Sequence, residues 1–209
     1  MMKNTKPKIN MKYLEEKETI NIDDNIEYIR ISNYELKENI KGIEFNSCIL
    51  EKVDFSKVKI EKVDFVDCIF NKCDLSNIDL SERLILRCEF NDCKLIGAKF
   101  VSSSLQNILF NNCLMNYSNF NNSRIKEVEF NNVKLKDSTF IEVNHNKLEL
   151  NSCDLENSEL FKTKLKDVDL STSTIEGILV NTNDLIGCYI NSYQATLLIR
   201  GFGVNIKDE

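Results

Sequence analysis

Residues 68–75 read CIFNKCDL, and residues 88–95 read CEFNDCKL. Each stretch holds two cysteines five residues apart, each cysteine stands two residues before a Phe or a Leu, and twenty residues separate the stretches. Taken alone, the pattern is compatible with a metal site, with disulfides, with redox chemistry or with a packing repeat. The rest of the chain decides among these readings, because the same spacing recurs far beyond both stretches.

The chain repeats with a period of five residues. Of the 30 positions from Phe45 to Ile190 whose numbers are divisible by five, all but His145 hold Phe, Leu, Ile, Met or Val. The position two residues earlier is mostly Cys, Ser, Thr, Ala, Val or Ile, with Arg83 as the most polar exception. A fixed short period of this kind indicates a repeat architecture. The cysteines all share the second phase: Cys48, Cys68, Cys73, Cys88, Cys93, Cys113, Cys153 and Cys188.

The five-residue unit predicts a coil of short strands. Its order is small, polar, large, polar, polar, and the first three positions alternate as a strand does when every second side chain faces a core. The two following polar positions, often Asn, Asp or Ser, suit a turn. Phe70, Phe90, Phe110 and Phe130 are spaced by twenty residues, which predicts four fives per coil. We therefore expect an all-β, quadrilateral β-helix of about 7.5 coils with a rise of ~4.8 Å per coil.

This geometry places the cysteines in the core. Small apolar side chains are needed at the corners of such a coil, and cysteine is among the most buried residue types. A zinc site built from the paired cysteines is the sharper alternative, but the chain has a single His, and Ser, Val and Ala replace Cys in other units. Stacked cysteines would also lie close enough for disulfides, which a reducing compartment disfavours. Core packing is the interpretation we favour, with no cofactor and no metal.

Composition narrows the class of protein further. The 209 residues carry a net charge of −6, whereas nucleic-acid-binding proteins are normally basic, so no direct nucleic-acid partner is expected. No apolar run approaches the ~18 residues of a membrane span, and the N-terminal stretch lacks the apolar core of a secretory signal. We expect a cytoplasmic protein that does not associate with a membrane. An enzyme is the least favoured class, because nothing resembles a nucleophile with its base.

The repeat resembles that of the pentapeptide-repeat proteins, whose consensus is A(D/N)LXX. The segments CDLSN (73–77) and CDLEN (153–157) fit it closely, and the resemblance covers residues 43–192. It implies a right-handed quadrilateral β-helix. Residues 1–42 are then an N-terminal lead-in and cap: 1–18 are expected to be flexible or weakly helical, and the first repeats, near 29–36, are out of phase. The segment KENIKG (37–42) must absorb this shift.

The C-terminal segment NSYQATLLIRGFGVNI (191–206) resembles the ending of the Qnr and MfpA proteins. That resemblance implies binding to DNA gyrase and topoisomerase IV, protection of these enzymes from quinolones, and a homodimer joined through this segment. Residues 193–209 are thus a capping and dimerisation segment, with a short helix over 193–200 that Ser192 can cap and Gly201 can end. A monomer whose cap folds onto the last coil is the alternative. The expected interface residues are Tyr193, Ala195, Leu197, Leu198 and Phe202.

In the resembling family, an acidic rod imitates duplex DNA. Two outward positions of this chain carry acidic residues at twenty-residue spacing, which predicts stripes along the rod that could steer it toward a basic channel. Leu109 and Leu114 interrupt the stripes, and Lys94, Lys134 and Lys164 occupy the same class of position. A solvated face with an unrelated protein partner, as in a structural scaffold, therefore stays open. The candidate partner-binding residues are Asp54, Asp74, Glu89, Glu129, Glu149, Asp154 and Asp169.

Two polar residues stand in apolar positions of the repeat. Arg83 occupies a small-residue position and His145 a large-residue position. Because an unpaired buried Arg is costly, we expect a local bulge or a side chain that turns outward at Arg83. His145 is expected to mark a similar irregularity rather than a catalytic base.

Overall fold

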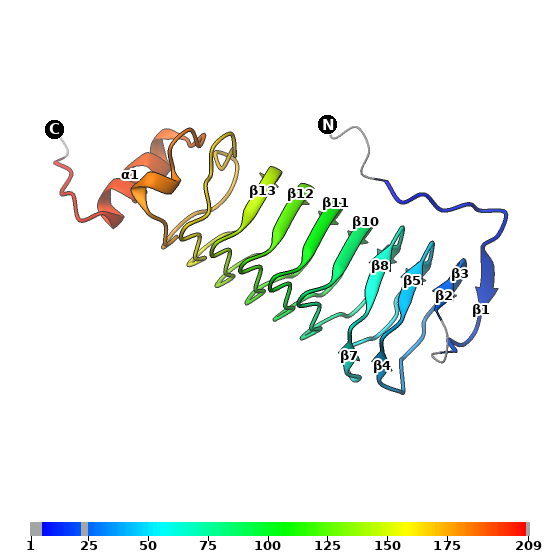
Figure 1. Cartoon of the computed structure of the whole chain (residues 1–209). Helices are drawn as coiled ribbons and strands as arrows, with labels where there is room; N and C mark the ends of the chain where they lie inside the picture. Colours follow the sequence, from blue (N-terminus) through cyan, green and yellow to red (C-terminus); the bar gives the residue numbers. More distant parts are fainter. Residues whose placement is uncertain (1–5, 22–24, 208–209) are drawn as a thin grey trace.

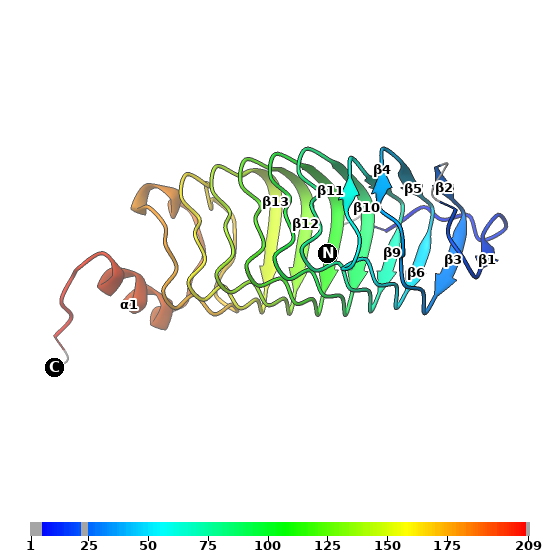
Figure 2. The ribbon, with the colours of Figure 1, turned by 90° about the horizontal axis from the view of Figure 1, so that it is seen from below.

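The computed structural model describes residues 6–21 and 25–207 as a rod of stacked coils, with a single α-helix at its C-terminal end (Figure 1). The coils lie one above another along the rod, as the view from below shows (Figure 2). All pairings between the named strands are parallel. The first strands are β1 (Glu15–Lys17), β2 (Ile26–Glu27), β3 (Ile29–Ser32), β4 (Ile40–Lys41), β5 (Glu44–Asn46), β6 (Ile49–Glu51), β7 (Ile60–Glu61), β8 (Asp64–Val66) and β9 (Ile69–Asn71).

Longer strands build the middle of the rod. They are β10 (Leu84–Asn91), β11 (Ser104–Asn111), β12 (Arg124–Asn131) and β13 (Asn144–Asn151), followed by the 3-10 helix η1 (Thr182–Asp184) and α1 (Ser192–Gly201). Each long strand joins two consecutive five-residue units, which the sequence predicts as separate short strands. In the described chain the other sides of the coil hold isolated bridges, such as Asp54 with Asp74, apart from the pair formed by β4 and β7. The predicted all-β solenoid with a short C-terminal helix is confirmed, although its strands are unequal in length.

The register confirms the twenty-residue coil. Phe70 lies opposite Phe90, Phe90 opposite Phe110, and Phe110 opposite Phe130. The rings of Phe90 and Phe110 stack with centroids 4.9 Å apart and planes at 17°. Phe100, Phe120 and Phe140 form the second stack, at 4.7 and 4.6 Å. Such aromatic contacts add to the free energy gained by burying the rings.

The core follows the repeat residue by residue. The large and the small positions are buried in nearly every coil, and nine phenylalanines are among the largest fully buried side chains. At the corners, a residue with positive φ precedes the small position; Arg87, Asn107, Glu127 and Lys147 are examples, with φ of 51, 56, 53 and 66°. Left-handed backbone is costly for residues other than Gly, by roughly 1 kcal/mol each, so burial of the large side chains has to offset a repeated local strain.

The N-terminal end differs from the rest in register. Ile26 lies opposite Phe45 and Glu35 bridges to Asp54, an offset of nineteen residues, whereas Ile40 lies opposite Ile60 at twenty. The first coil is therefore one residue shorter. Residues 6–18 contain no helix; β1 extends the sheet by pairing with β3. The expectation of a weakly helical lead-in is thus wrong for these residues, and residues 1–5 lie outside the described part.

Candidate protein-binding surfaces

The first predicted acidic stripe exists as a vertical column on the long strands. Glu89, Leu109, Glu129 and Glu149 lie opposite one another in successive strands from β10 to β13. All three Glu side chains are half-buried, and Glu129 accepts a hydrogen bond from Asn131 Nδ2 at 2.8 Å. Asp169 does not continue the column, because no bridge of the described chain joins it to Glu149; it bridges to Tyr189 of the following coil. The stripe therefore ends at β13.

The second predicted stripe alternates in charge. Bridges connect Asp54, Asp74, Lys94, Leu114, Lys134 and Asp154 in that order. Lys94 pairs with Asp74 and Lys134 with Asp154, with N–O distances of 3.6 Å in both pairs. Exposed pairs of this kind contribute only about 0–1 kcal/mol to stability. Their consequence for function is larger, because each lysine cancels a carboxylate of the column.

The aspartates of these positions also close turns. Asp54 Oδ1 accepts a hydrogen bond from Ser56 N at 2.9 Å, Asp74 from Ser76 N at 3.0 Å, and Asp169 from Ser171 N at 2.8 Å. An Asp side chain that bonds the amide two residues on forms an Asx turn. The hydrogen bond from the Ser56 side chain holds the pKa of Asp54 below its usual value, and Ser171 does the same for the pKa of Asp169. The carboxylates are charged at neutral pH, but the turn alone accounts for the residue type.

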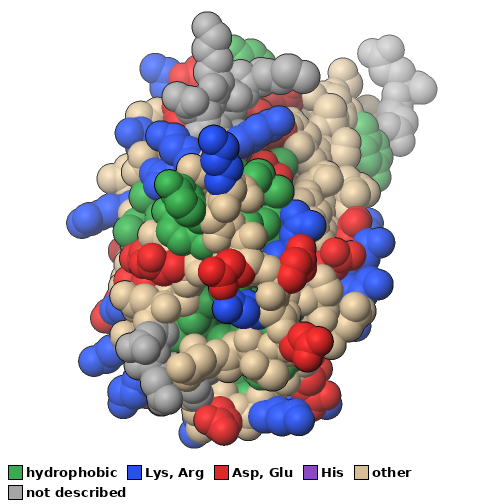
Figure 3. All heavy atoms as spheres, turned by 90° about the vertical axis from the view of Figure 1, so that its right-hand side faces the viewer, with side chains coloured by type: hydrophobic (Ala, Val, Ile, Leu, Met, Phe, Trp, Pro, Cys, Tyr) green, Lys and Arg blue, Asp and Glu red, His purple; other side chains and the backbone are tan. Residues whose placement is uncertain are grey.

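The density of negative charge is low compared with DNA. Duplex DNA carries one charge per roughly 1.7 Å of its axis, or about three charges over the ~4.8 Å rise of one coil. The column from Glu89 to Glu149 carries three carboxylates over four coils. Figure 3 views the N-terminal end of the rod, where acidic and basic side chains alternate over the surface. Any acidic contact with a partner is therefore local, limited to the column on the long strands.

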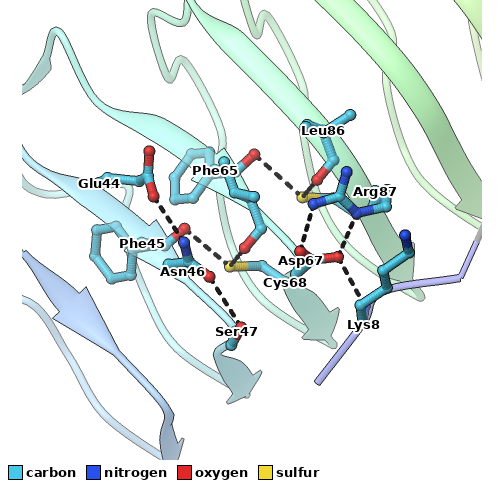
Figure 4. Close-up of polar contacts among 12 residues, drawn as sticks. Lys8, Glu44, Phe45, Asn46, Ser47, Phe65, Asp67, Cys68, Leu86 and Arg87 are labelled. Carbon is cyan, nitrogen blue, oxygen red and sulfur yellow. Dashed lines mark hydrogen bonds and ion pairs between the residues drawn. The ribbon is translucent and has the colours of Figure 1, made fainter. Parts of the chain in front are cut away.

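Arg87 and Asp67 form the most enclosed ion pair of the rod's middle, which the sequence analysis missed. Arg87 Nε and Nη2 donate to the two carboxylate oxygens of Asp67, each at 2.6 Å, and Asp67 Oδ1 also accepts from the backbone amide of Lys8 at 2.7 Å (Figure 4). The Asp67 side chain is 9% exposed, and the pair raises the pKa of Arg87. The twenty-residue spacing of Asp67 and Arg87 is the signal that could have found it. The contact fastens the N-terminal segment along the rod.

Seven of the eight cysteines lie inside, as predicted, and act as weak donors as well as fillers, whereas the core position predicted for Cys188 is wrong because this residue is only half-buried. Cys68 Sγ lies 3.3 Å from the carbonyl oxygen of Phe45, twenty-three residues earlier (Figure 4), and Cys88 Sγ lies 3.5 Å from that of Phe65. Ser138 and Ser158 use the same position to donate to Met115 O and Leu135 O. This shared bond explains why Cys and Ser exchange in the repeat.

The buried thiols of Cys93 and Cys153 are held in their protonated form. All eight cysteines are free. A hydrogen bond with Cys113 and burial raise the pKa of Cys93 to about 12, and burial raises the pKa of Cys153 to about 12. Within residues 6–21 and 25–207, no group of three or more His, Cys, Asp or Glu side chains could hold a metal ion. In the same part of the chain, no helix is both long and apolar enough to cross a membrane.

The C-terminal helix closes the last coil by a capping box. Asn191, rather than Ser192, is the N-cap: its side chain accepts from Gln194 N at 2.9 Å, and Gln194 Oε1 accepts from Asn191 N at 2.9 Å. Gln194 Nε2 also donates to the carbonyls of Leu170 and Ser173, at 2.7 Å each. The helix ends at Gly201, but the positive φ of 82° belongs to Gly203.

The five expected interface residues divide into two groups. Leu198 is only 7% exposed and packs on the core, so it serves the cap. Ala195 and Leu197 are half-buried, whereas Tyr193 and Phe202 are 62% and 43% exposed. Other large apolar side chains of the same end are also exposed. We call this set the C-terminal apolar patch: Leu179, Ile186, Tyr189, Tyr193, Ile199, Phe202, Val204 and Ile206.

Arg83 and His145 behave differently. Arg83 N donates to Leu80 O as Ser103 N does to Phe100 O, so the backbone forms no bulge, and the half-buried side chain turns to donate to Ser81 O. His145 is half-buried and lies opposite Ile125 of β12. Its Nε2 lies 2.5 Å from the carbonyl oxygen of Lys164, with Nε2 donating. His145 itself lies within β13. The irregularity is found in the next coil, in which the described chain forms no strand.

One family model and several solved structures match this chain. Residues 63–140 match the family model described as a pentapeptide repeat region. A trypsin-treated QnrB1 variant, a plasmid-mediated fluoroquinolone resistance protein, is 14% identical; the match covers 86% of this chain and 99% of that one, with a TM-score of 0.38. HetL, from the cyanobacterium Nostoc and involved in heterocyst differentiation regulation, is 15% identical over 81% of this chain and 90% of its own, also with a TM-score of 0.38.

Among curated proteins, no match is found. The family match covers the regular middle of the rod, where the five-residue unit, the buried small and large positions and the constant register are all present. The same unit continues in the sequence on both sides of it. Over residues 63–140 the chain therefore resembles the pentapeptide-repeat proteins.

Proposed function

We propose that this chain is a protein-binding rod that pairs with a second copy through its C-terminal apolar patch and binds a type II topoisomerase, DNA gyrase or topoisomerase IV, which it protects from quinolones. The observation that carries the proposal is the division of the surface. An apolar patch lies at the C-terminal end, and a column of carboxylates lies on the long strands. Because side chains fill the core, a partner has to bind to such outer surfaces.

The acidic column gives the topoisomerase a defined contact. Glu89, Glu129 and Glu149 project from neighbouring strands of one sheet, and no ion pair joins Glu89 or Glu129 to a lysine in the described chain. Carboxylates held on a rigid sheet lose little entropy when they bind lysines or arginines of a partner. The proposed mimicry of DNA therefore concerns this face alone and not the net charge of the rod.

A supercoiling and cleavage assay with purified gyrase and a fluoroquinolone tests the topoisomerase proposal. The chain at micromolar concentration should lower the amount of drug-stabilised cleaved DNA. A variant with Glu89→Gln, Glu129→Gln and Glu149→Gln should lose most of that effect, whereas Asp79→Asn, on another side of the coil, should keep it. If the unaltered chain neither protects nor inhibits gyrase, the topoisomerase proposal fails.

A scaffold with an unrelated protein partner is the second candidate. The observation that favours it is the neutralised second column, in which Lys94 and Lys134 pair with Asp74 and Asp154. A surface of balanced charge is poorly suited to a strongly basic channel. Absence of an effect in the gyrase assay, together with retained pairing of two copies, would favour the scaffold.

The pairing of two copies is tested separately by light scattering. Tyr193→Asp with Ile199→Asp places charges on the exposed face of α1 and should halve the measured mass, because a buried unpaired charge is costly. Tyr117→Asp is the matched control, since Tyr117 is 63% exposed in the middle of the rod, against 62% for Tyr193. An unchanged mass of the double variant, or a monomeric unaltered chain, would refute the dimer.

A further inference from the structure

The sheet of long strands stops at β13, although the repeat in the sequence continues. β13 pairs with β12 and is the last strand of the sheet in the described chain. In the preceding coils the amide of one coil bonds the carbonyl of the coil before it: Asn144 N donates to Ser123 O at 3.0 Å. By the same pattern Lys164 N should donate to Val143 O. No backbone hydrogen bond of the described chain joins residues 143–150 to residues 163–170.

Side-chain hydroxyl groups connect the two coils at the ends of the stretch in which the backbone hydrogen bonds are missing. Val143 N donates to Thr163 Oγ1, Ser152 N to Thr172 Oγ1 and Cys153 N to Ser173 Oγ, each at 3.0 Å. Backbone pairing resumes only beyond them, where Thr174 N donates to Cys153 O at 2.8 Å. The ladder is therefore interrupted along the length of one long strand and held at both ends by hydroxyl groups.

Three backbone groups at this edge, in residues 143–148, lack the partner that their equivalents in earlier coils have. They are Val143 C=O, the Lys147 amide, whose equivalent Asp67 N donates to Leu86 O, and Leu148 C=O, whose equivalent Cys68 O accepts from Glu89 N. Unpaired main-chain groups of a strand edge are a template for another strand. In a compact protein almost every buried backbone group is paired, so this edge is suited to an additional partner.

A cleft of about 760 Å³ lies beside this edge. β13 forms one wall, and the segment from Lys162 to Val168 forms the other. Figure 1 shows β13 as the last arrow of the row, with the following coil drawn without a strand. The volume falls within the range of roughly 300–1,000 Å³ that ligand sites occupy.

His145 holds the two walls apart. In the three preceding coils the same register position carries the buried apolar residues Ile85, Leu105 and Ile125. His145 instead donates from Nε2 to the Lys164 carbonyl across the cleft, and its buried Nδ1 has no partner. An imidazole placed between two strands prevents the direct backbone pairing that an aliphatic side chain would permit.

The lining of the cleft carries a small excess of basic residues. Four lysines line it, Lys147, Lys162, Lys164 and Lys166, against three acidic residues, and the first three of these lysines already form ion pairs with carboxylates. Lys166 forms no ion pair in the described chain. A neighbouring hollow shares Lys162 and Lys164, adds Asp184 to its lining and continues toward Phe202. An occupant with acidic side chains would find Lys166 without an ion pair, and it could approach the exposed side chains of Lys162 and Lys164 at little cost in desolvation.

We propose that this cleft binds an extended, acidic peptide segment of a partner protein, which adds to β13 as a parallel strand. Strand addition of this kind takes its affinity from main-chain hydrogen bonds and its specificity from alternate side chains. One edge of the added strand pairs with Val143 C=O, the Lys147 amide and Leu148 C=O, while its acidic side chains face the lysines. The site is separate from both the carboxylate column and the C-terminal apolar patch.

Hydrogen exchange on the free chain is the first test. The Lys147 amide should exchange fast, whereas the amide of Glu127, its equivalent in the paired strand β12, should be protected. If the Lys147 amide is protected in the free chain, the edge is closed and the proposal is overturned. If that protection disappears when residues 203–209 are deleted, the chain's own tail is the occupant, which equally overturns a partner site.

Peptide binding is the second test, with a fluorescein-labelled octapeptide of alternating Glu and Val read by anisotropy. It should bind and slow exchange at Lys147, while the same peptide with Lys in place of Glu should bind at least about tenfold more weakly, a difference of ~1.4 kcal/mol. A peptide N-methylated at alternate residues, which cannot donate to β13, should not bind. No binding of the acidic peptide, or equal binding of all three, would overturn the proposal.

Two variants locate the site. His145→Ile restores the residue type of Ile125 and should close the cleft and abolish peptide binding, with slow exchange at Lys147 reporting the closed ladder. Lys147→Glu with Lys166→Glu should reverse the preference between the acidic and basic peptides. Lys126→Glu is the matched control, because Lys126 is exposed on β12, which is paired on both sides. A preference altered equally by the control would place the binding elsewhere.

Discussion

Residues 84–151 and residues 162–190 carry the same repeat in sequence and differ in how their backbone is paired. The first region contains β10 to β13, joined residue by residue at a constant offset of twenty. The second contains η1 and isolated bridges, and no strand in the part of the chain that the structure describes. Yet Leu165, Leu170 and Ile175 are as buried as their equivalents in the first region.

The difference shows that burial and backbone pairing are separable in this fold. The spacing of large residues determines which side chains enter the core, and it does so in both regions. Pairing depends in addition on what stands between the strands. Where the two regions meet, His145, Thr163 and Ser173 place side-chain atoms between backbones that from β10 to β13 pair directly. Beyond Asp167, left-handed corners fall on Gly177 and Gly187, so the corners of the second region are less strained.

The largest expected difference concerns the aromatic stack. Phe110→Ala should lower the free energy of unfolding by about 3–5 kcal/mol, because the fully buried ring lies between Phe90 and Phe130 at 4.9 Å on either side. Leu185→Ala, in the second region and partly buried, should cost about 1 kcal/mol. Urea denaturation followed by circular dichroism measures both. Equal losses would mean that the two regions are packed alike.

The next largest loss of stability is expected at the hydroxyl hydrogen bonds that flank the interrupted ladder. Thr163→Val removes an acceptor for Val143 N and a donor to Phe140 O, so two buried backbone groups lose their partner and stability should fall by about 2 kcal/mol. Ser158→Ala is the matched control, since Ser158 Oγ donates only to Leu135 O, at 2.8 Å. It should cost about half as much. A Thr163→Val variant as stable as the control would show that the hydroxyl does not hold the opening.

The buried thiols make stability depend on pH. The pKa of Cys153 is raised by burial to about 12, from 9.0 for a free thiol. The unfolded chain therefore ionises first and binds fewer protons, so this contribution is complete below pH 9 and is lost as the pH rises toward 12. At 1.36 kcal/mol per pKa unit, the loss between pH 8 and pH 10 should be about 1.4 kcal/mol smaller in a Cys153→Ala variant. An identical loss in both proteins would contradict the assignment.

The smallest expected effect is a difference in thiol reactivity between the cysteines of the two regions. Cys188 is half-buried, and burial raises its pKa to about 11, whereas the other seven cysteines are fully buried in the core. A thiol-reactive dye at pH 8 should therefore label Cys188 slowly and the remaining cysteines only after unfolding. Cys188→Ser should abolish labelling of the folded chain. Labelling of a second cysteine under native conditions would show that the coils of the first region open.

Much of the architecture could be predicted from the repeat. The stacking of Phe90 on Phe110 and the burial of Cys73 and Cys93 follow from a period of five within a period of twenty, and both are confirmed. The C-terminal helix is confirmed as well, although Asn191 caps it in place of Ser192. Local sequence offers both residues as caps, and the choice falls to Asn191 because its Nδ2 also reaches Ser171 O of the coil before, at 2.8 Å.

The candidate surfaces could be predicted only in part. The twenty-residue spacing predicted the columns of outward residues. The pairing of Lys94 with Asp74 depends in addition on which long side chains meet across neighbouring coils. The Arg87–Asp67 pair joins one coil to the next and then to Lys8, far away in the sequence. The cleft beside β13 was not foreseen, because the repeat passes through it without a break.

The sequence by itself determined the coil. The position of a residue within the five-residue unit decides whether its side chain enters the core or faces solvent, because strand and turn geometry repeat in every unit. Only the tertiary structure decided where the ladder opens, how the charges of a column cancel and which apolar residues stay outside at the C-terminal end. These features depend on contacts between residues about twenty positions apart. A strand's hydrogen bonds to its neighbour form only if both backbones approach, and a single intervening side chain such as that of His145 keeps them apart.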